Sequence, residues 1–211
     1  MKELIKKVQN VPEEIKDVVD KRLGEFREFR NKGNEEWFSE LCFCLLTANS
    51  KARTALNIQN ELGFKGFSSH SQEKIRDAIK RNKHRFHNNK AKYIFEARPH
   101  VRIKDTIHGI IAEKSLLEAR EWLVNNIKGL GYKEASHFLR NVGFDGIAIL
   151  DRHIINLMHE HNILKERPKS LSRVNYLLIE QEFNKLAEKA GMSSAEMDLT
   201  MWYLKAGEVL K

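Results

Sequence analysis

Two helical patterns separated by two glycines mark the part of this 211-residue chain that is best suited to chemistry. The segment runs from Leu123 to Leu139, and its turn has the sequence Lys128-Gly129-Leu130-Gly131. Glycine accepts positive φ angles and lets a backbone approach a ligand closely. Because the first N–H groups of the second helix have no partner within that helix, such a turn can bind phosphate. An ordinary helical hairpin with a glycine turn has the same pattern, so both interpretations stay open.

Lys133 is the reactive side chain nearest to this turn. It falls in the first turn of the second helix, where a cation opposes the helix dipole and is a poor choice for a purely structural residue. A lysine amine is also a nucleophile that forms covalent intermediates. The alternative is a solvent-exposed helix lysine, in a chain where lysine and arginine together number 37.

Asp151 lies 18 residues after Lys133, between an apolar run and a helical pattern. An aspartate in that position is a favourable N-cap, and we expect it to have that role. The same carboxylate, at the mouth of a cleft and facing Lys133, would stabilise positive charge developing on a sugar ring, as carboxylates do in glycoside-cleaving enzymes. From the residues alone, the cap and the charge-stabilising carboxylate both stay open as roles of Asp151.

Helical periodicity accounts for nearly every segment around these residues, so we expect an all-α fold. Only three prolines and 11 glycines argue against a loop-rich β-sandwich or barrel. The expected N-caps are Asn34, Ser71, Ser115 and Asp151, and Gly63 is expected to end a helix. The expected helices cover residues 13–29, 37–48, 51–62, 72–82, 89–97, 116–127, 132–142, 152–161, 174–190 and 194 to the C-terminus.

No low-complexity stretch, internal repeat or Gly/Ser linker separates independent domains. We therefore expect residues 1–211 to form one compact unit with two helical lobes. One lobe would run from about residue 35 to 130, and the other would combine residues 1–34 and 131–211. The helix-hairpin-helix would lie at the cleft between them.

The composition limits the class of protein. The 37 basic and 29 acidic residues give a formal net charge of +8, which favours a polyanionic partner, although a solvated cationic surface has the same balance. Cys42 and Cys44 are too few for a disulfide framework or a four-thiolate zinc or iron–sulfur site. The N-terminus lacks the apolar run of a signal peptide, and no run of about 18 apolar residues would span a membrane.

The Gly-x-Gly-x-Lys turn, followed by a glycine-containing loop and an aspartate that opens a helix, resembles the helix-hairpin-helix DNA glycosylase superfamily. In its bifunctional members, the lysine at the position of Lys133 attacks C1′ of the damaged nucleotide, and the aspartate at the position of Asp151 assists. The segment LLTANSKARTA (residues 45–55) is similar to the helix–turn–helix whose polar residue, here Asn49, fills the gap in the DNA. NNKAKYI (residues 88–94) is similar to the superfamily's Lys-Ala-x-x-Ile helix.

Within the superfamily, the chain resembles the small archaeal-type 8-oxoguanine DNA glycosylases, which have about this length and lack an iron–sulfur cluster. The C-terminal sequence DLTMWYLKAGEVLK is also similar to theirs, and its Asp198 and Trp202 share a helix face at positions i and i+4. The resemblance implies that Trp202 stacks on 8-oxoguanine, that Asp198 contacts its Watson–Crick edge, and that the terminal carboxylate of Lys211 reaches the base pocket. From the residues alone, a core tryptophan and an exposed aspartate are the alternatives.

Phe86 is a further candidate for the base pocket or the DNA gap, with a core position as its alternative. Near it, a basic stretch either contacts phosphates or forms a solvated face; it comprises Arg81, Arg85, Lys90 and Lys92. The nine histidines show no metal-ligand spacing, so we expect no metal site and no cofactor.

The expected activity is excision of 8-oxoguanine from duplex DNA, followed by β-elimination at the abasic site through a lysine Schiff base. Two alternatives stay open: a glycosylase for another oxidised base, and a non-catalytic helix-hairpin-helix module that only grips the DNA backbone. The expected partner is double-stranded DNA containing 8-oxoguanine or abasic sites, and no membrane. We expect a cytoplasmic, nucleoid-associated monomer from a prokaryote.

Overall fold

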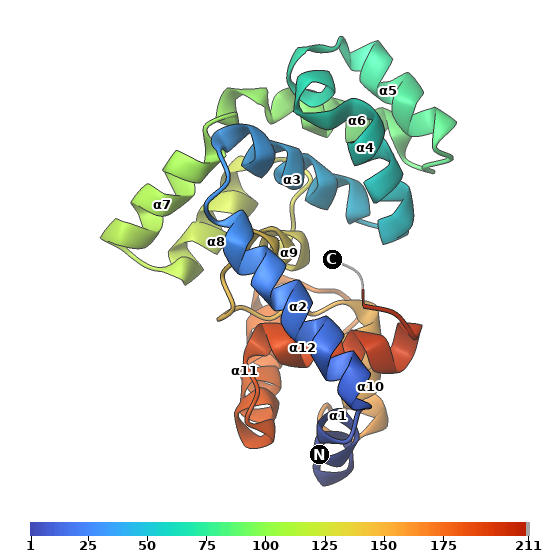
Figure 1. Cartoon of the computed structure of the whole chain (residues 1–211), viewed down its shortest axis with the longest axis vertical. Helices are drawn as coiled ribbons and strands as arrows, with labels where there is room; N and C mark the ends of the chain where they lie inside the picture. The colour runs from blue at the N-terminus through green and yellow to red at the C-terminus, as the bar shows by residue number, and fades with distance from the viewer. Residues whose placement is uncertain (210–211) are drawn as a thin grey trace. The chain divides into compact units, whose positions relative to one another are not determined.

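The computed structural model describes residues 1–209, and all regular structure within them is helical (Figure 1). The elements are α1 (Lys2–Gln9), α2 (Glu13–Phe29), α3 (Asn34–Thr47), α4 (Ala52–Ser69), α5 (Gln72–Arg81), α6 (His87–Glu96), the 3₁₀ turn η1 (Arg98–His100), α7 (Ile103–Glu113), α8 (Leu116–Asn126), α9 (Tyr132–Asn141), α10 (Arg152–Glu160), α11 (Arg173–Ala190) and α12 (Ser194–Ala206). Across these residues, no helix combines the length and apolarity needed to cross a membrane. The expected all-α fold is confirmed.

The chain divides into two compact units, one of residues 31–138 and one of residues 1–30 and 139–211. The division falls inside α9, between Phe138 and Leu139, whereas the expected lobes divide before this helix. The first half of α9 belongs to the 31–138 unit because its side chains pack there. The rings of Phe138 and Trp37, for example, meet edge to face with centroids 5.9 Å apart.

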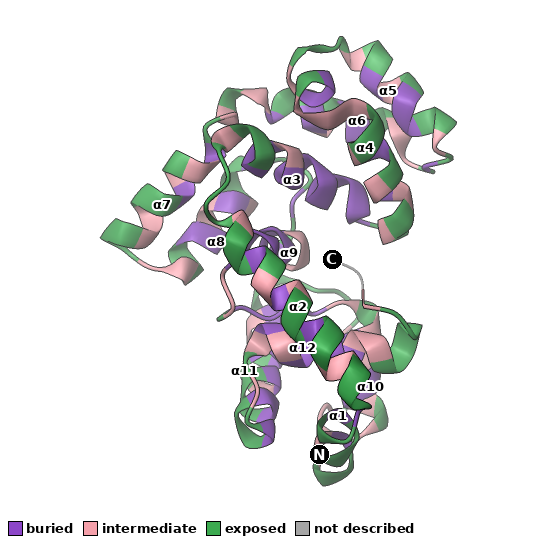
Figure 2. Cartoon of the chain, viewed as in Figure 1, coloured by how far each residue is buried: buried purple, intermediate pink, exposed green. Residues whose placement is uncertain are grey.

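α3 forms the core of the 31–138 unit (Figure 2). From Trp37 to Thr47 every residue except Ser39 is buried, as expected of a helix that is apolar on nearly all sides. Helices α4, α6 and α7 pack around it. The burial extends to the last residue of α3, so the polar groups at its C-terminal end are also enclosed by protein.

The other unit depends on the packing of α2 against α12. Val19, Leu23 and Phe26 of α2 occur at three- and four-residue steps and meet Ala195 and Leu199 of α12 in one apolar cluster. α10 also packs on α12, and α1 packs on α11 and α12. These contacts fix α10 and α12, where several candidate residues lie, relative to each other.

Three of the four expected N-caps are confirmed. The side chains of Ser71, Ser115 and Asp151 accept hydrogen bonds from N–H groups in the first turns of α5, α8 and α10. The expectation for Asn34 is wrong, because α3 begins at Asn34 itself and Gly33 is its N-cap. The amide oxygen of Asn34 instead accepts from a backbone N–H near the start of α7, at 3.0 Å.

Gly63 interrupts α4 as expected, with a φ of +54°, but helical residues resume after it and continue to Ser69. The expectation that the helix ends at Gly63 is therefore confirmed only in part. Two helices, α1 and α7, lie outside the expected set. Both have apolar residues at helical spacing, namely Leu4 and Val8 in α1 and Ile103 and Ile107 in α7, so their sequences are compatible with the helices that form.

Candidate functional site

The helix-hairpin-helix consists of α8, the turn of residues 127–131 and α9. Two hydrogen bonds hold its helices together. The Tyr132 hydroxyl donates to Glu121 Oε2 at 2.6 Å, and the buried guanidinium of Arg120 donates to Ser136 Oγ at 3.2 Å. Because both bonds join α8 to α9, they fix the geometry of the turn between the helices.

The two glycines of the turn have different roles. Gly129 has a φ of +89°, and a Cβ added to it would lie 2.3 Å from Cδ2 of Tyr93 in α6, so no L side chain fits without displacing that ring. Gly131 has no positive φ, and its Cβ would meet only the flexible end of the Glu134 side chain, at 3.2 Å. Gly129 therefore shapes the turn, while the exposed backbone of Gly131 is open to a ligand.

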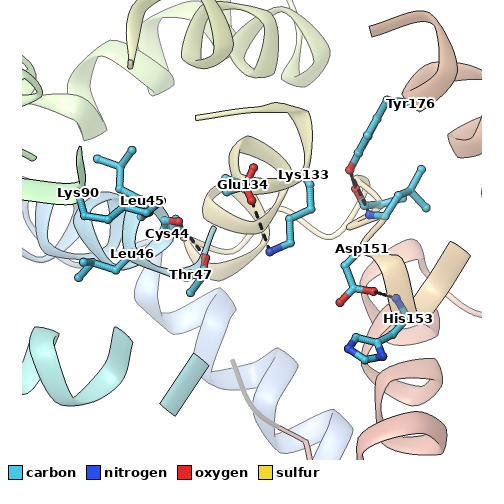
Figure 3. A network of polar contacts seen from close by, with 12 residues as sticks. Cys44, Leu45, Leu46, Thr47, Lys90, Lys133, Glu134, Asp151, His153 and Tyr176 are labelled. Carbon is cyan, nitrogen blue, oxygen red and sulfur yellow. Dashed lines mark hydrogen bonds and ion pairs between the residues drawn. The ribbon is translucent and has the colours of Figure 1, made fainter. Parts of the chain in front are cut away.

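Lys133 lies in the first turn of α9, as expected (Figure 3). Its side chain is 23% exposed, and its Nζ lies 3.7 Å from Oε1 of Glu134. The backbone N–H groups of Gly131 and Lys133 have no acceptor within residues 1–209. These open donors and the positive end of the helix dipole favour a bound anion beside a partly exposed amine.

Asp151 is the N-cap of α10, and the extended residues before it are fastened to α11. Its Oδ1 accepts from the N–H of His153 at 2.8 Å (Figure 3) and from the N–H of Ile154 at 2.9 Å. The buried Tyr176 hydroxyl donates to the carbonyl oxygen of Ala148 at 2.8 Å and accepts from the N–H of Leu150 at 3.2 Å. Because both capping bonds end on Oδ1, the cap leaves the second oxygen of the carboxylate for another role.

Asp198 and Trp202 both lie on α12 but have different surroundings. Asp198 is buried and ion-paired with Arg140 of α9, whose Nη1 donates to Oδ2, so the interpretation of Asp198 as an exposed residue is wrong. Trp202 is half-buried, and its ring meets that of His153 edge to face at 5.1 Å. Its Nε1 is buried and has no hydrogen-bond partner among the described residues. Lys211 lies outside the described residues.

The candidates for the DNA gap are partly or fully exposed. Asn49 follows α3 in an exposed turn with a φ of +59°, a conformation that asparagine adopts more readily than most residues. Phe86 is the N-cap of α6 and is half-buried, so it is not a core residue. The guanidinium of Arg85 lies 5.1 Å from the centre of its ring.

Both interpretations of Lys90, a phosphate contact or a solvated cation, are wrong. Lys90 is 5% exposed, and its Nζ donates to the carbonyl oxygen of Leu45 at 2.6 Å. Burial lowers the pKa of Lys90 to about 8; the charge of Lys133 adds to this effect and Glu134 opposes it. The amine is therefore part of the interior, where it satisfies a carbonyl group of α3.

The other cations of this region are exposed but have acidic neighbours. Lys128 Nζ and Lys92 Nζ lie 3.5 and 3.8 Å from the carboxylate of Glu96, and Arg81 is paired with Glu61. Exposed ion pairs contribute little free energy. These cations can therefore exchange their partners for phosphate groups.

This all-α chain has a glycine turn that leads into a helix with a lysine in its first turn, and an aspartate that caps a later helix. This arrangement is that of the helix-hairpin-helix class of DNA glycosylases. The sequence model of the 8-oxoguanine DNA glycosylase family matches residues 19–192, and the chain belongs to this family.

Relatives match over the full length. The 8-oxoguanine DNA glycosylase/AP lyase of Methanocaldococcus jannaschii is 50% identical over 209 residues, which cover 99% of each chain. That of Thermotoga maritima is 40% identical over 213 residues and covers 100% of both chains. The crystal structure of the M. jannaschii protein in complex with 15mer DNA containing 8-oxoguanine has a TM-score of 0.94 and 48% identity, over 99% of each chain.

Several residues that position the candidates gave little signal in the sequence. Arg140 is a charged residue in a buried part of α9, and a charge among apolar neighbours is a local sign of a buried partner. That partner, Asp198, is 58 residues away in the sequence. Tyr176 and His84 show no such sign, because each acts on backbone groups of a distant segment. Only the fold brings these groups together.

Gly129→Ala should destabilise the protein by about 1–3 kcal/mol, because the substitution forces a side chain into positive φ and against Tyr93. It should also weaken binding to undamaged duplex DNA, since the turn loses its shape. Gly131→Ala is the matched control and should change stability by less than about 0.5 kcal/mol. Urea unfolding and fluorescence anisotropy measure the two quantities, and equal losses of stability in the two variants would contradict this division of roles.

Lys90→Met should change how stability depends on pH. An unfolded lysine keeps its proton up to its usual pKa of 10.5, whereas folded Lys90 loses it near 8, so the unfolded chain binds more protons between these values. Relative to the variant, the wild type should therefore gain stability as the pH rises through this range, by on the order of 3 kcal/mol.

Urea unfolding at about pH 7.5 and about pH 9.5 covers part of this range, and over it the wild type should gain roughly 2 kcal/mol relative to the variant. Lys92→Met, which removes an exposed lysine from the same helix, is the control and should run parallel to the wild type. A Lys90→Met variant that also runs parallel would show that Lys90 has an ordinary pKa.

Proposed function

We propose that this protein excises 8-oxoguanine from duplex DNA and cleaves the resulting abasic site through Lys133. The observation that carries the proposal is a partly exposed lysine amine beside unpaired N–H groups at the start of α9, in a member of the 8-oxoguanine DNA glycosylase family. The M. jannaschii relative is named a glycosylase/AP lyase, and its solved complex holds DNA containing 8-oxoguanine. A purely DNA-gripping module would need the turn but not the amine.

In the first step, the protein holds the DNA backbone and the damaged nucleotide leaves the stack. The open N–H groups of Gly131 and Lys133 suit a phosphate, and the net charge of +8 favours the duplex as a whole. Extruding a base costs a few kcal/mol, roughly, which contacts in the pocket and the gap offset. Asn49 fills the gap in this proposal, and its exposed, left-handed turn supports that role.

In the second step, the uncharged amine of Lys133 attacks C1′ while the bond from C1′ to N9 of the base breaks, and the departing base takes up a proton. Asp151 stabilises the positive charge that develops on the sugar ring. Opening of the ring gives an imine between Lys133 and C1′. Loss of a C2′ proton then breaks the bond from C3′ to its oxygen, the strand is cleaved on the 3′ side, and water releases the lysine. An arginine could not form this imine.

The base pocket of the proposal is built on α12. Trp202 stacks on the extruded purine, which its half-exposed ring supports. Asp198 contacts the Watson–Crick edge, and the bond from Arg140 holds its carboxylate in one orientation. Lys211 belongs to the proposal through the resemblance, and Phe86 is a further candidate for this pocket or for the gap, which its half-buried position supports.

Lys133→Gln should abolish protein–DNA adducts trapped by borohydride, because an amide keeps the polarity of the side chain but cannot form an imine. Binding to the lesion should remain. The substrates are duplexes containing 8-oxoguanine, with guanine and thymine glycol as controls. A trapped adduct of undiminished yield would show that another amine is the nucleophile, and an adduct formed only with thymine glycol would assign a different base.

Trp202→Ala should slow excision of 8-oxoguanine, because base–aromatic stacking contributes ~1–3 kcal/mol per base. Cleavage of a preformed abasic site should survive, since no base has to be held there. Both activities and the melting temperature are measured on the same preparation. Truncating a core tryptophan would instead remove roughly 3–5 kcal/mol of stability, so a parallel loss of both activities with a large drop in melting temperature would place Trp202 in the core.

A further inference from the structure

The C-terminal end of α3 is buried, and each of its last four carbonyl groups has a partner. Two of the bonds are local: the Thr47 hydroxyl donates to the carbonyl oxygen of Cys44 at 2.8 Å (Figure 3), and the Ser50 N–H donates to that of Thr47 at 3.1 Å. These groups have no partners within the helix itself, so they must be satisfied from elsewhere.

The other two carbonyls receive side chains from a distant part of the chain. Lys90 Nζ donates to Leu45 O at 2.6 Å, and His84 Nε2 lies 2.9 Å from Leu46 O. Both donor side chains are almost fully buried, at 5% and 3% exposed. His84 lies in the turn between α5 and α6, and Lys90 lies in α6, so this region clamps the end of α3.

His84 also bonds to the backbone of Phe86. The Phe86 N–H donates to His84 Nδ1 at 3.1 Å. A carbonyl oxygen only accepts and an N–H only donates, so the two bonds together require a proton on Nε2 and none on Nδ1. The neutral ring therefore links two turns, one that leads to Asn49 three residues after Leu46 and one that carries Phe86.

We propose that His84 and Lys90 are positioning residues that hold the Asn49 turn for insertion into DNA, and that His84 ties this turn to Phe86 so that Asn49 and Phe86 act as one unit. The inference rests on the proposed function in one respect, namely that Asn49 enters the gap. Asparagine adopts a left-handed φ more readily than most residues, and the bonds that fix the end of α3 limit the other conformations of the turn that carries it.

The burial of His84 fits this role. Desolvation lowers its pKa, and Lys90 and His87 of α6 act in the same direction, while the bond to Leu46 O opposes them. The group of α3 nearest to the His84 ring is the carbonyl of Leu46, which carries no charge. His84 thus remains neutral at neutral pH, as the pair of bonds requires.

A double-mutant cycle tests the proposal through binding, without using the chemistry at Lys133. The four proteins are the wild type, His84→Ala, Asn49→Gly, which keeps the left-handed turn but removes the side chain, and the double variant. The measurement is affinity for a duplex with a tetrahydrofuran abasic analogue, relative to the undamaged duplex. We expect His84→Ala to lower this preference on the order of tenfold, because two hydrogen bonds are lost, and to lower it much less when Asn49 is already Gly.

His84→Gln, whose amide keeps one donor and one acceptor, should recover part of the preference. Lys90→Met should reproduce the loss through the other clamped carbonyl, and Lys74→Met, which removes an exposed lysine of α5, should have no effect. Additive losses in the double variant, or a full preference in both His84→Ala and Lys90→Met, would overturn the proposal. If His84→Ala does not fold, the cycle is run with Lys90→Met.

Failure of the proposed function gives a different result. In that case the wild type itself would excise no 8-oxoguanine and would show no preference for the abasic analogue. The cycle is informative wherever the wild type has that preference, whichever base it excises.

Discussion

A helix ends with four carbonyl groups, and begins with four N–H groups, that no residue of the same helix can satisfy. This constraint decides much of the chemistry in a protein whose described residues form only helices and connections. At the C-terminal end of α3, protein groups satisfy each of the last four carbonyls, and the end is buried. At the N-terminal end of α9, the N–H groups of Gly131 and Lys133 have no acceptor among the described residues, and the end can bind an anion.

At the N-terminal end of α10, a protein group satisfies N–H groups of the helix and also has an oxygen left for a ligand. One oxygen of Asp151 satisfies two N–H groups, so the residue is needed for the helix. The bonds from Tyr176 fix the extended residues before it, and they set where the carboxylate lies. The bonds that make Asp151 the cap of α10 therefore also fix the position of its carboxylate, as the proposed charge-stabilising role requires.

Much of this could be predicted from the sequence, because it depends on local patterns. The buried α3 follows from a run that is apolar on nearly all sides, and the caps at Ser71, Ser115 and Asp151 follow from short polar side chains before periodic segments. The glycine turn with a lysine just after it indicated the hairpin. The close approach of Gly129 to Tyr93 could not be predicted in this way, because it depends on how α6 packs against the turn.

What the sequence did not reveal depends on contacts across many residues. Lysine is usually a surface residue, yet the amine of Lys90 lies in the interior, where it donates to the carbonyl oxygen of Leu45. Asp198 has the pattern of an exposed helix position, yet Arg140 holds it in the unit formed by residues 1–30 and 139–211. Asparagine is a common N-cap residue, but the side chain of Asn34 accepts a hydrogen bond from the N–H of Lys104 near the start of α7. In each case a distant group decides the role of the residue.

The central claim is that Asp151 has a chemical role beyond its capping bonds, and Asp151→Asn tests it most directly. Asparagine caps a helix nearly as well as aspartate, so the substitution removes the charge and keeps the structural role. The measurement is single-turnover excision of 8-oxoguanine from a duplex, together with the melting temperature of the same preparation. We predict a rate reduced on the order of 100-fold or more with little change in melting temperature. A rate near that of the wild type would show that Asp151 is only a cap and would contradict the proposed mechanism.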